Sequence, residues 1–162
     1  MAEAVERGRD YILQIQRPDG AWYGSWGICF TYGTWFGVSG LRAAGLDEDD
    51  PAIQRALEFL VDRQLPDGGW GELPESCRLG EYIQAEEGQA VMTSWALLAL
   101  VKGGRRDSEA VARGVEFLID RQCDDGTWPD EHICGVFNHT CAIHYDNYLK
   151  IFPTWALAAC RS

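Results

Sequence analysis

The chain has 162 residues, of which 46% are hydrophobic and 24% are charged, and its formal net charge is −11. A chain of this length and apolar content buries about two thirds of its unfolded surface in one globular domain, here residues 1–162, so intrinsic disorder is excluded. The acidic balance repels a nucleic-acid backbone or an anionic membrane surface, so no nucleic-acid partner is expected.

The first half of the chain predicts two amphipathic helices on either side of an apolar one. Residues 3–16 and 51–64 carry apolar side chains at helical spacing on one face. Asp50 is placed to cap the second of these helices, and Pro51 follows where a missing N–H costs nothing. Between them, residues 31–45 are apolar on nearly all sides, which is typical of a buried helix.

The second half repeats this order after a long connection. Residues 71–87 favour irregular or short extended structure. Residues 88–102 and 147–160 are apolar on nearly all sides and predict buried helices. The amphipathic segment 108–122 lies between them, and Ser108 is its predicted cap.

This alternation of helix types predicts two concentric layers, with one-sided helices facing water and apolar helices packed inside them. No stretch alternates with period two for long enough to require a sheet. The predicted fold is therefore all-α. It consists of about three helical hairpins that form part of an α/α toroid, roughly half of an α6/α6 barrel.

The strongest pattern is a repeat of sixteen residues that occurs three times. Each copy begins with an arginine and a small residue, continues with an apolar run and a glutamine, and ends in Asp-Gly and a tryptophan. The glutamine and tryptophan pairs are Gln16 with Trp22, Gln64 with Trp70, and Gln122 with Trp128, and a second tryptophan follows each pair at Trp35, Trp95 and Trp155. Such a register predicts three stacked copies of one two-element unit.

With the repeats laid out, the chain resembles the triterpene cyclases, whose Gln-to-Trp repeats match these three copies. It is most similar to the C-terminal part of the oxidosqualene cyclases, with the squalene-hopene cyclases as the other branch. The similarity rests on the motifs in residues 24–36, 67–77 and 135–143, which include Gly-Ser-Trp-Gly, Gly-Gly-Trp-Gly-Glu and Gly-Val-Phe-Asn. Together they cover nearly the whole chain in order.

The resemblance implies a function in sterol and triterpene biosynthesis, where such isomerases protonate a polyene epoxide and guide a cascade of carbocations. Aromatic faces stabilise cations without attacking them. Trp26 and Phe137 are implied to line the cavity, with Cys141 and Tyr145 in the same wall, whereas plain core packing is the structural alternative. The Gln side chains are implied to bond a neighbouring helix end under the Trp rings.

The acid of such an enzyme is missing from the sequence, because no Asp-Cys-Thr motif occurs. Residues 47–50 fit the Asp-x-Asp-Asp pattern of the other branch, but they precede Pro51 at a helix start, so we interpret them as capping and solubility residues. The acidic residues of 72–87 are interpreted in the same way, as a solvated loop. The chain alone is therefore expected to be inactive. A stand-alone, non-catalytic binder of hydrophobic ligands, or a scaffold, is the competing hypothesis.

The expected partners follow from an incomplete toroid that exposes its inner helices. A hydrophobic, oxidosqualene-like polyene would fill the cavity, and either an upstream cyclase half or a second copy in a homodimer would cover the open ends. No cofactor is expected. A metal is disfavoured because the spacing of His132, Cys134, His139, Cys141 and His144 matches no zinc-binding unit.

The compartment is predicted from the cysteines and the N-terminal residues. Six cysteines occur without a visible secretory signal, which favours a reduced intracellular environment over a disulfide framework. No apolar run approaches the roughly 20 residues that span a bilayer. We expect a cytoplasmic or peripheral membrane protein.

Overall fold

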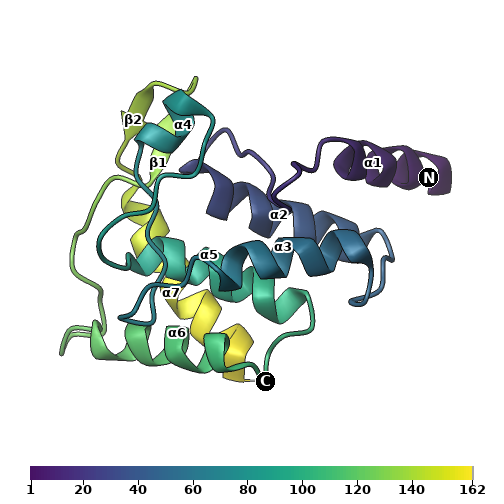
Figure 1. The fold of residues 1–162 in the computed structure, drawn as a ribbon. Coiled ribbons are helices and arrows are strands. Elements are labelled where there is room, and N and C mark those ends of the chain that lie inside the picture. Colours follow the sequence, from purple (N-terminus) through teal and green to yellow (C-terminus); the bar gives the residue numbers. More distant parts are fainter. Residues whose placement is uncertain (162) are drawn as a thin grey trace.

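The computed structural model describes residues 1–161, which form two layers of helices and one small hairpin (Figure 1). Within these residues the elements are α1 (Ala2–Gln14), α2 (Cys29–Ala43), α3 (Pro51–Val61), α4 (Glu75–Leu79), α5 (Ala90–Lys102), α6 (Glu109–Asp120), β1 (Gly135–Phe137), β2 (Cys141–Ile143) and α7 (Asp146–Arg161). The inner helices α2, α5 and α7 pack side by side with α5 in the middle, and α1, α3 and α6 lie outside them. The predicted helical hairpins of an α/α toroid are confirmed.

The outer helices α3 and α6 begin where their caps were predicted. The Asp50 carboxylate accepts a hydrogen bond from the backbone N–H of Ala52 at 2.8 Å. The Ser108 hydroxyl accepts one from the N–H of Val111 at 3.3 Å. Each cap satisfies a donor that has no partner within its helix, which fixes the start of the helix.

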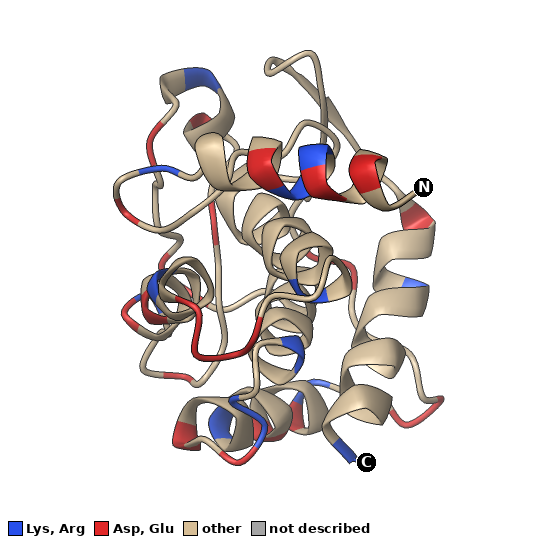
Figure 2. Ribbon diagram, turned by 90° about the vertical axis from the view of Figure 1, so that its right-hand side faces the viewer, with Lys and Arg blue, Asp and Glu red and all other residues tan. Residues whose placement is uncertain are grey.

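The core is centred on α5, in which every residue from Ala90 to Leu100 is buried. Its only charged residue is Lys102 at the C-terminal end, and the charges of the molecule lie mainly on outer helices and loops (Figure 2). A helix that is apolar on all sides is most stable when other helices surround it, because none of its apolar surface then faces water. The expectation of a buried inner helix is thus confirmed for α5.

The helix α7 departs from that expectation. Only Pro153 and Ala156 are buried, whereas Ile151 and Trp155 are about half exposed. The reason is that α7 packs mainly on α5 and α6 and meets α2 through the Trp35 ring, so part of its apolar surface stays uncovered within the described residues. The helix α1 is also largely uncovered, since it has no buried residue and extends away from the body of the molecule (Figure 1).

Two short elements lie in connections. The helix α4 and an isolated bridge between Glu72 and Gln84 occupy the long connection, where short irregular structure was predicted. The hairpin β1–β2 was not predicted, because strands of three residues are too short to show a period of two. Its tip places Asn138 and His139 at positive φ, a backbone region that few non-glycine residues adopt.

No helix in the part of the chain that the structure describes combines the length and the apolar character needed to cross a bilayer.

Candidate functional site: an aromatic wall beside the repeat turns

The repeat tryptophans close the outer helices that precede them. The indole N–H groups of Trp22, Trp70 and Trp128 donate to the carbonyls of Ile12, Leu60 and Leu118 at 2.7, 2.7 and 2.9 Å. Carbonyls in the last turn of a helix have no partner within the helix. Each tryptophan therefore satisfies one of them and packs the repeat turn against its own helix.

The repeat glutamines connect one copy to the next. The Gln16 amide donates to the carbonyl of Gly20 in its own turn and to that of Ala52 in the first turn of α3, at 2.9 and 2.8 Å. Gln64 makes the same pair of bonds with Gly68 and Ala110, both at 2.8 Å. The outer helices are thus tied together through side-chain amides.

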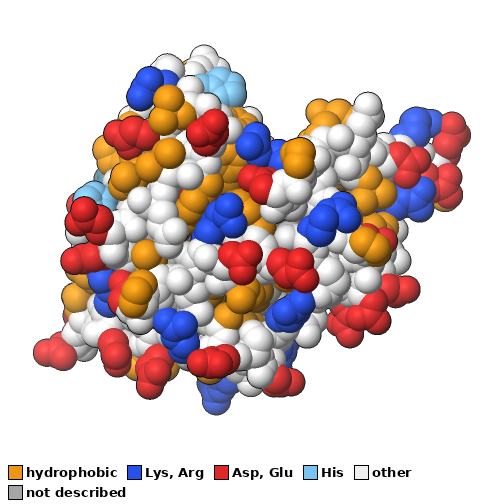
Figure 3. All heavy atoms as spheres, in the orientation of Figure 1, with side chains coloured by type: hydrophobic (Ala, Val, Ile, Leu, Met, Phe, Trp, Pro, Cys, Tyr) orange, Lys and Arg blue, Asp and Glu red, His pale blue; other side chains and the backbone are white. Residues whose placement is uncertain are grey.

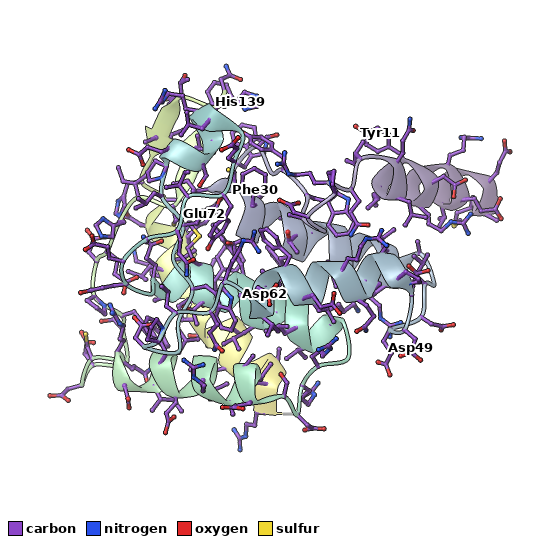
Figure 4. All side chains as sticks on the ribbon, in the orientation of Figure 1. Tyr11, Phe30, Asp49, Asp62, Glu72 and His139 are labelled. Atoms are coloured by element: carbon purple, nitrogen blue, oxygen red, sulfur yellow. The ribbon has the colours of Figure 1, made fainter. Side chains whose placement is uncertain are left out.

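The start of α2 is held by a buried carboxylate. Glu72 is fully buried, and its two oxygens accept from the backbone N–H groups of Cys29, Phe30 and Thr31 at 2.9 to 3.0 Å and from the Thr31 hydroxyl at 2.9 Å. Figure 4 shows Glu72 and Phe30 close together beneath the hairpin. The interpretation of Glu72 as part of a solvated acidic loop was therefore wrong, because these donors replace the water that the carboxylate loses. The signal that could have found it is its position two residues after Trp70.

The hairpin carries Phe137 to the side of Trp26. The segment around Trp26 pairs with β1, because the Val136 N–H donates to the Trp26 carbonyl at 3.1 Å and the Ile28 N–H donates to the Cys134 carbonyl at 2.9 Å. The two aromatic rings lie with centroids 5.3 Å apart. They are 50% and 40% exposed, so this pair forms a surface and is not core packing.

Cys141 and Tyr145 lie on the same part of the molecule. Cys141 is paired with Phe137 in the register of the hairpin and is exposed. The ring of Tyr145 packs directly on Gly135, where any larger residue would collide with it. The same ring packs on Tyr148 with centroids 4.8 Å apart. We define Trp26, Phe137, Cys141 and Tyr145 as the aromatic wall.

Three titratable groups near the aromatic wall have pKa values that burial raises. Burial raises the pKa of Tyr148 to about 12 and also raises the pKa of Tyr32. Burial raises the pKa of the Cys134 thiol to about 12. These groups stay protonated, so none of them is a strong nucleophile. Neutral aromatic faces of this kind attract cations through the ring quadrupole.

Apolar surface also extends beyond the predicted residues. Phe36 on α2 and Trp155 on α7 are half exposed, and sequence reasoning missed both because it treated their helices as buried. Phe36 and Trp26 line a hollow of about 460 Å³ between α1 and α2. Figure 3 shows hydrophobic side chains gathered over α4 and the hairpin as well.

The acidic segment 47–50 lies in the connection between α2 and α3, away from the aromatic wall. Asp50 caps α3, and Asp49 points outward at the far end of the molecule (Figure 4). A general acid must hold its proton against the substrate, and an exposed loop does not provide that environment.

The histidines and cysteines of the hairpin region do not converge on one point. His144 pairs with Asp130 and Asp146 at 2.9 and 3.1 Å, whereas His139 meets the Tyr23 hydroxyl. No three His, Cys, Asp or Glu side chains among residues 1–161 are arranged to hold a metal ion.

Comparison with known proteins relates the whole chain to one family. The model of the squalene-hopene cyclase C-terminal domain matches residues 1–162. The chain is 45% identical to lanosterol synthase from Homo sapiens over 159 residues, and 52% identical to cycloartenol synthase from Dictyostelium discoideum over 155 residues. Each match covers 96% of this chain and 22% of the relative, so the chain spans less than a quarter of the length of these proteins.

Similar solved structures share the fold. A type II terpene cyclase from Scytonema, in complex with merosterolic acid A, superimposes on 98% of this chain and 48% of its own with a TM-score of 0.68 and 20% sequence identity. The same cyclase in its apo form gives a TM-score of 0.63 over 80% of this chain.

Proposed function

The chain belongs to the family of the squalene-hopene cyclase C-terminal domain, and from that premise we propose that it forms one cavity wall of an oxidosqualene cyclase-like enzyme. The substrate class is a thirty-carbon polyene such as 2,3-oxidosqualene, and the reaction is ring closure through successive carbocations. The aromatic wall would stabilise the later cations, and Phe137 and Trp26 would be nearest to them.

The observation that carries this proposal is the pairing of Trp26 with Phe137. Two segments far apart in the sequence bring their rings to 5.3 Å, and backbone hydrogen bonds hold them there. Each ring stabilises a desolvated cation by about 1–2 kcal/mol. An apolar, neutral surface also protects a carbocation from water, which would end the cascade.

The chain alone is proposed to lack activity, since the acid that starts the reaction is not among its residues. Phenols with raised pKa values, such as those of Tyr32 and Tyr148, are too weak to protonate an epoxide near pH 7. The acid would come from an upstream cyclase half. That half, or a second copy of this chain, would also cover the exposed apolar surfaces of α2 and α7.

The binding test uses an amine that mimics the polyene cation, with affinity measured by calorimetry. Trp26→Ala and Phe137→Ala are each expected to weaken binding by about 5- to 30-fold, which corresponds to the 1–2 kcal/mol of one ring. Trp155→Ala is the matched control, because Trp155 is also half exposed but lies outside the aromatic wall. Equal losses in all three variants would refute the assignment of the wall.

The activity test joins the chain to an upstream half that carries an acid motif. Product is expected from the mixture and from neither part alone. If amine binding depends on Trp26 but no upstream half yields product, the chain is a non-catalytic binder of hydrophobic ligands.

A further inference from the structure

The tip of the hairpin β1–β2 is held weakly by the hairpin itself. Asn138 and His139 both have positive φ, at 49° and 62°, a backbone region that few residues with a Cβ adopt. The Thr140 hydroxyl donates to the Asn138 carbonyl at 3.2 Å, but this bond is exposed to water. Cys141 and Ala142 of β2 are exposed as well. A two-stranded hairpin of this size is not stable on its own, so contacts from outside must fix the direction of its tip.

The position of the Phe137 ring depends on that tip. Phe137 is the last residue of β1, and among the described residues the last backbone bond from β1 to the Trp26 segment is made one residue earlier, by the N–H of Val136. The Phe137 ring is 40% exposed and packs on Trp26 without being enclosed by the core. The course of the chain through the tip therefore decides where this ring lies.

Tyr23 binds the tip from the first repeat turn. Its hydroxyl contacts Nδ1 of His139, and the two rings pack with centroids 5.1 Å apart. Figure 4 shows His139 at the top of the molecule, above Phe30. Tyr23 directly follows Trp22 and lies three positions before Trp26 in the sequence. The segment that leads to Trp26 is therefore bonded to the hairpin both near its base and at its tip.

The helices α4 and α2 hold Tyr23 in turn. The Tyr23 hydroxyl donates to the Cys77 carbonyl of α4 at 3.2 Å, and its ring packs edge-on against Phe30 of α2 with centroids 5.6 Å apart. A carbonyl oxygen can only accept, and a phenol has one hydrogen to donate. The Tyr23 oxygen must therefore accept from His139, which carries a proton on Nδ1. Both bonds are satisfied in this arrangement alone.

We propose that the Tyr23–His139 contact positions Phe137 beside Trp26, so that Tyr23 is a positioning residue of the aromatic wall. The Tyr23 hydroxyl is occupied by its bonds to His139 and Cys77, and it acts on the wall through the hairpin tip. This inference rests on the proposed function only for the kind of ligand that the wall binds.

The first test measures the position of the rings without any ligand. Nuclear Overhauser cross-peaks between the Trp26 and Phe137 rings are expected in the wild-type chain. They should be lost in Tyr23→Phe, which removes the hydroxyl and keeps the ring that packs on Phe30. The imidazole nitrogen signals of His139 should place the proton on Nδ1 in the wild type and show a mixture of the two ring tautomers in the variant.

The matched control is Tyr82→Phe. Tyr82 also donates its hydroxyl to a backbone carbonyl, that of Gly71 at 3.0 Å, whereas its ring packs on Phe59 of α3. The two substitutions remove the same kind of hydrogen bond from a half-buried tyrosine, so a general loss of stability affects both variants. The cross-peaks between Trp26 and Phe137 should persist in Tyr82→Phe.

Binding of the amine that mimics the polyene cation tests the consequence for the wall. Tyr23→Phe is expected to weaken binding by about three- to tenfold, the change expected when one neutral hydrogen bond no longer holds the binding arrangement. In a chain that already carries Phe137→Ala, the same change should have no further effect, because Tyr23 acts through that ring. His139→Gly, which keeps positive φ without strain and removes the imidazole, should weaken binding as Tyr23→Phe does.

The inference is overturned if the ring cross-peaks and the His139 tautomer are unchanged in Tyr23→Phe, if this variant binds the amine as the wild type does, or if the losses from Tyr23→Phe and Phe137→Ala add. A wild-type chain that does not bind the amine would contradict the proposed function alone. The cross-peaks still decide the role of Tyr23 in that case, so the two failures are distinguishable.

Discussion

Replacement of Glu72 by alanine is expected to destabilise the fold more than any other single change at a charged residue. The substitution leaves the backbone N–H groups of Cys29, Phe30 and Thr31 without an acceptor at a fully buried helix start. An unsatisfied buried donor costs about 1–3 kcal/mol. Water enters the space left by the side chain and recovers part of this loss, so the expected decrease in unfolding free energy is about 3–5 kcal/mol.

Urea denaturation followed by tryptophan fluorescence measures this decrease. Glu81→Ala is the control, because Glu81 is exposed in the same connection and its removal should change stability by no more than about 0.5 kcal/mol. Thr31→Val, which removes only the hydroxyl that donates to Glu72 at 2.9 Å, should cost about 1 kcal/mol. A loss of less than 1 kcal/mol for Glu72→Ala would refute the view that this carboxylate holds the start of α2.

Three further outcomes are expected from urea denaturation. Gln64→Ala should lower the unfolding free energy by about 2 kcal/mol because it breaks the bond to Ala110 on α6, whereas Gln122→Ala should cost less than about 1 kcal/mol; equal losses would contradict the role of the amide as a tie between repeats. Asp50→Ala should cost about 1 kcal/mol through loss of the α3 cap, and an unchanged midpoint would argue against that cap. Burial raises the pKa of Tyr148 from 10.0 to about 12, so the stabilisation that the neutral phenol gives the folded state is full below pH 10 and is lost as the pH rises towards 12. Tyr148→Phe should make the fall of the unfolding free energy over this window shallower. An identical dependence on pH in the variant and the wild type would contradict this prediction.

The aromatic wall was predicted from the sequence only through resemblance. The motifs around Trp26 and Phe137 pointed to a cavity lining, but no local pattern indicated that a hairpin would join them. The contact of the hairpin with the Trp26 segment depends on backbone bonds between residues more than a hundred positions apart, and such pairing leaves no periodic signal. The placement of Cys141 opposite Phe137 is likewise a consequence of that register.

The sequence by itself determined what depends on near neighbours in the chain. Helical periodicity located the outer and inner helices, Asp50 and Ser108 located two of their starts, and the three repeats predicted the stacking of hairpins. Such features are visible because a helix turn and its cap involve residues within four positions of one another.

Only the tertiary structure decided which surfaces are covered. Glu72 is buried because a helix 43 residues earlier presents its unpaired donors to it, and Trp155 is exposed because no further helix lies against α7 in the described chain. Gln122 differs from Gln64 for the same reason, although the two stand in identical repeat positions. Burial and hydrogen bonding are properties of neighbours in space, and identical local sequences therefore meet different physical environments.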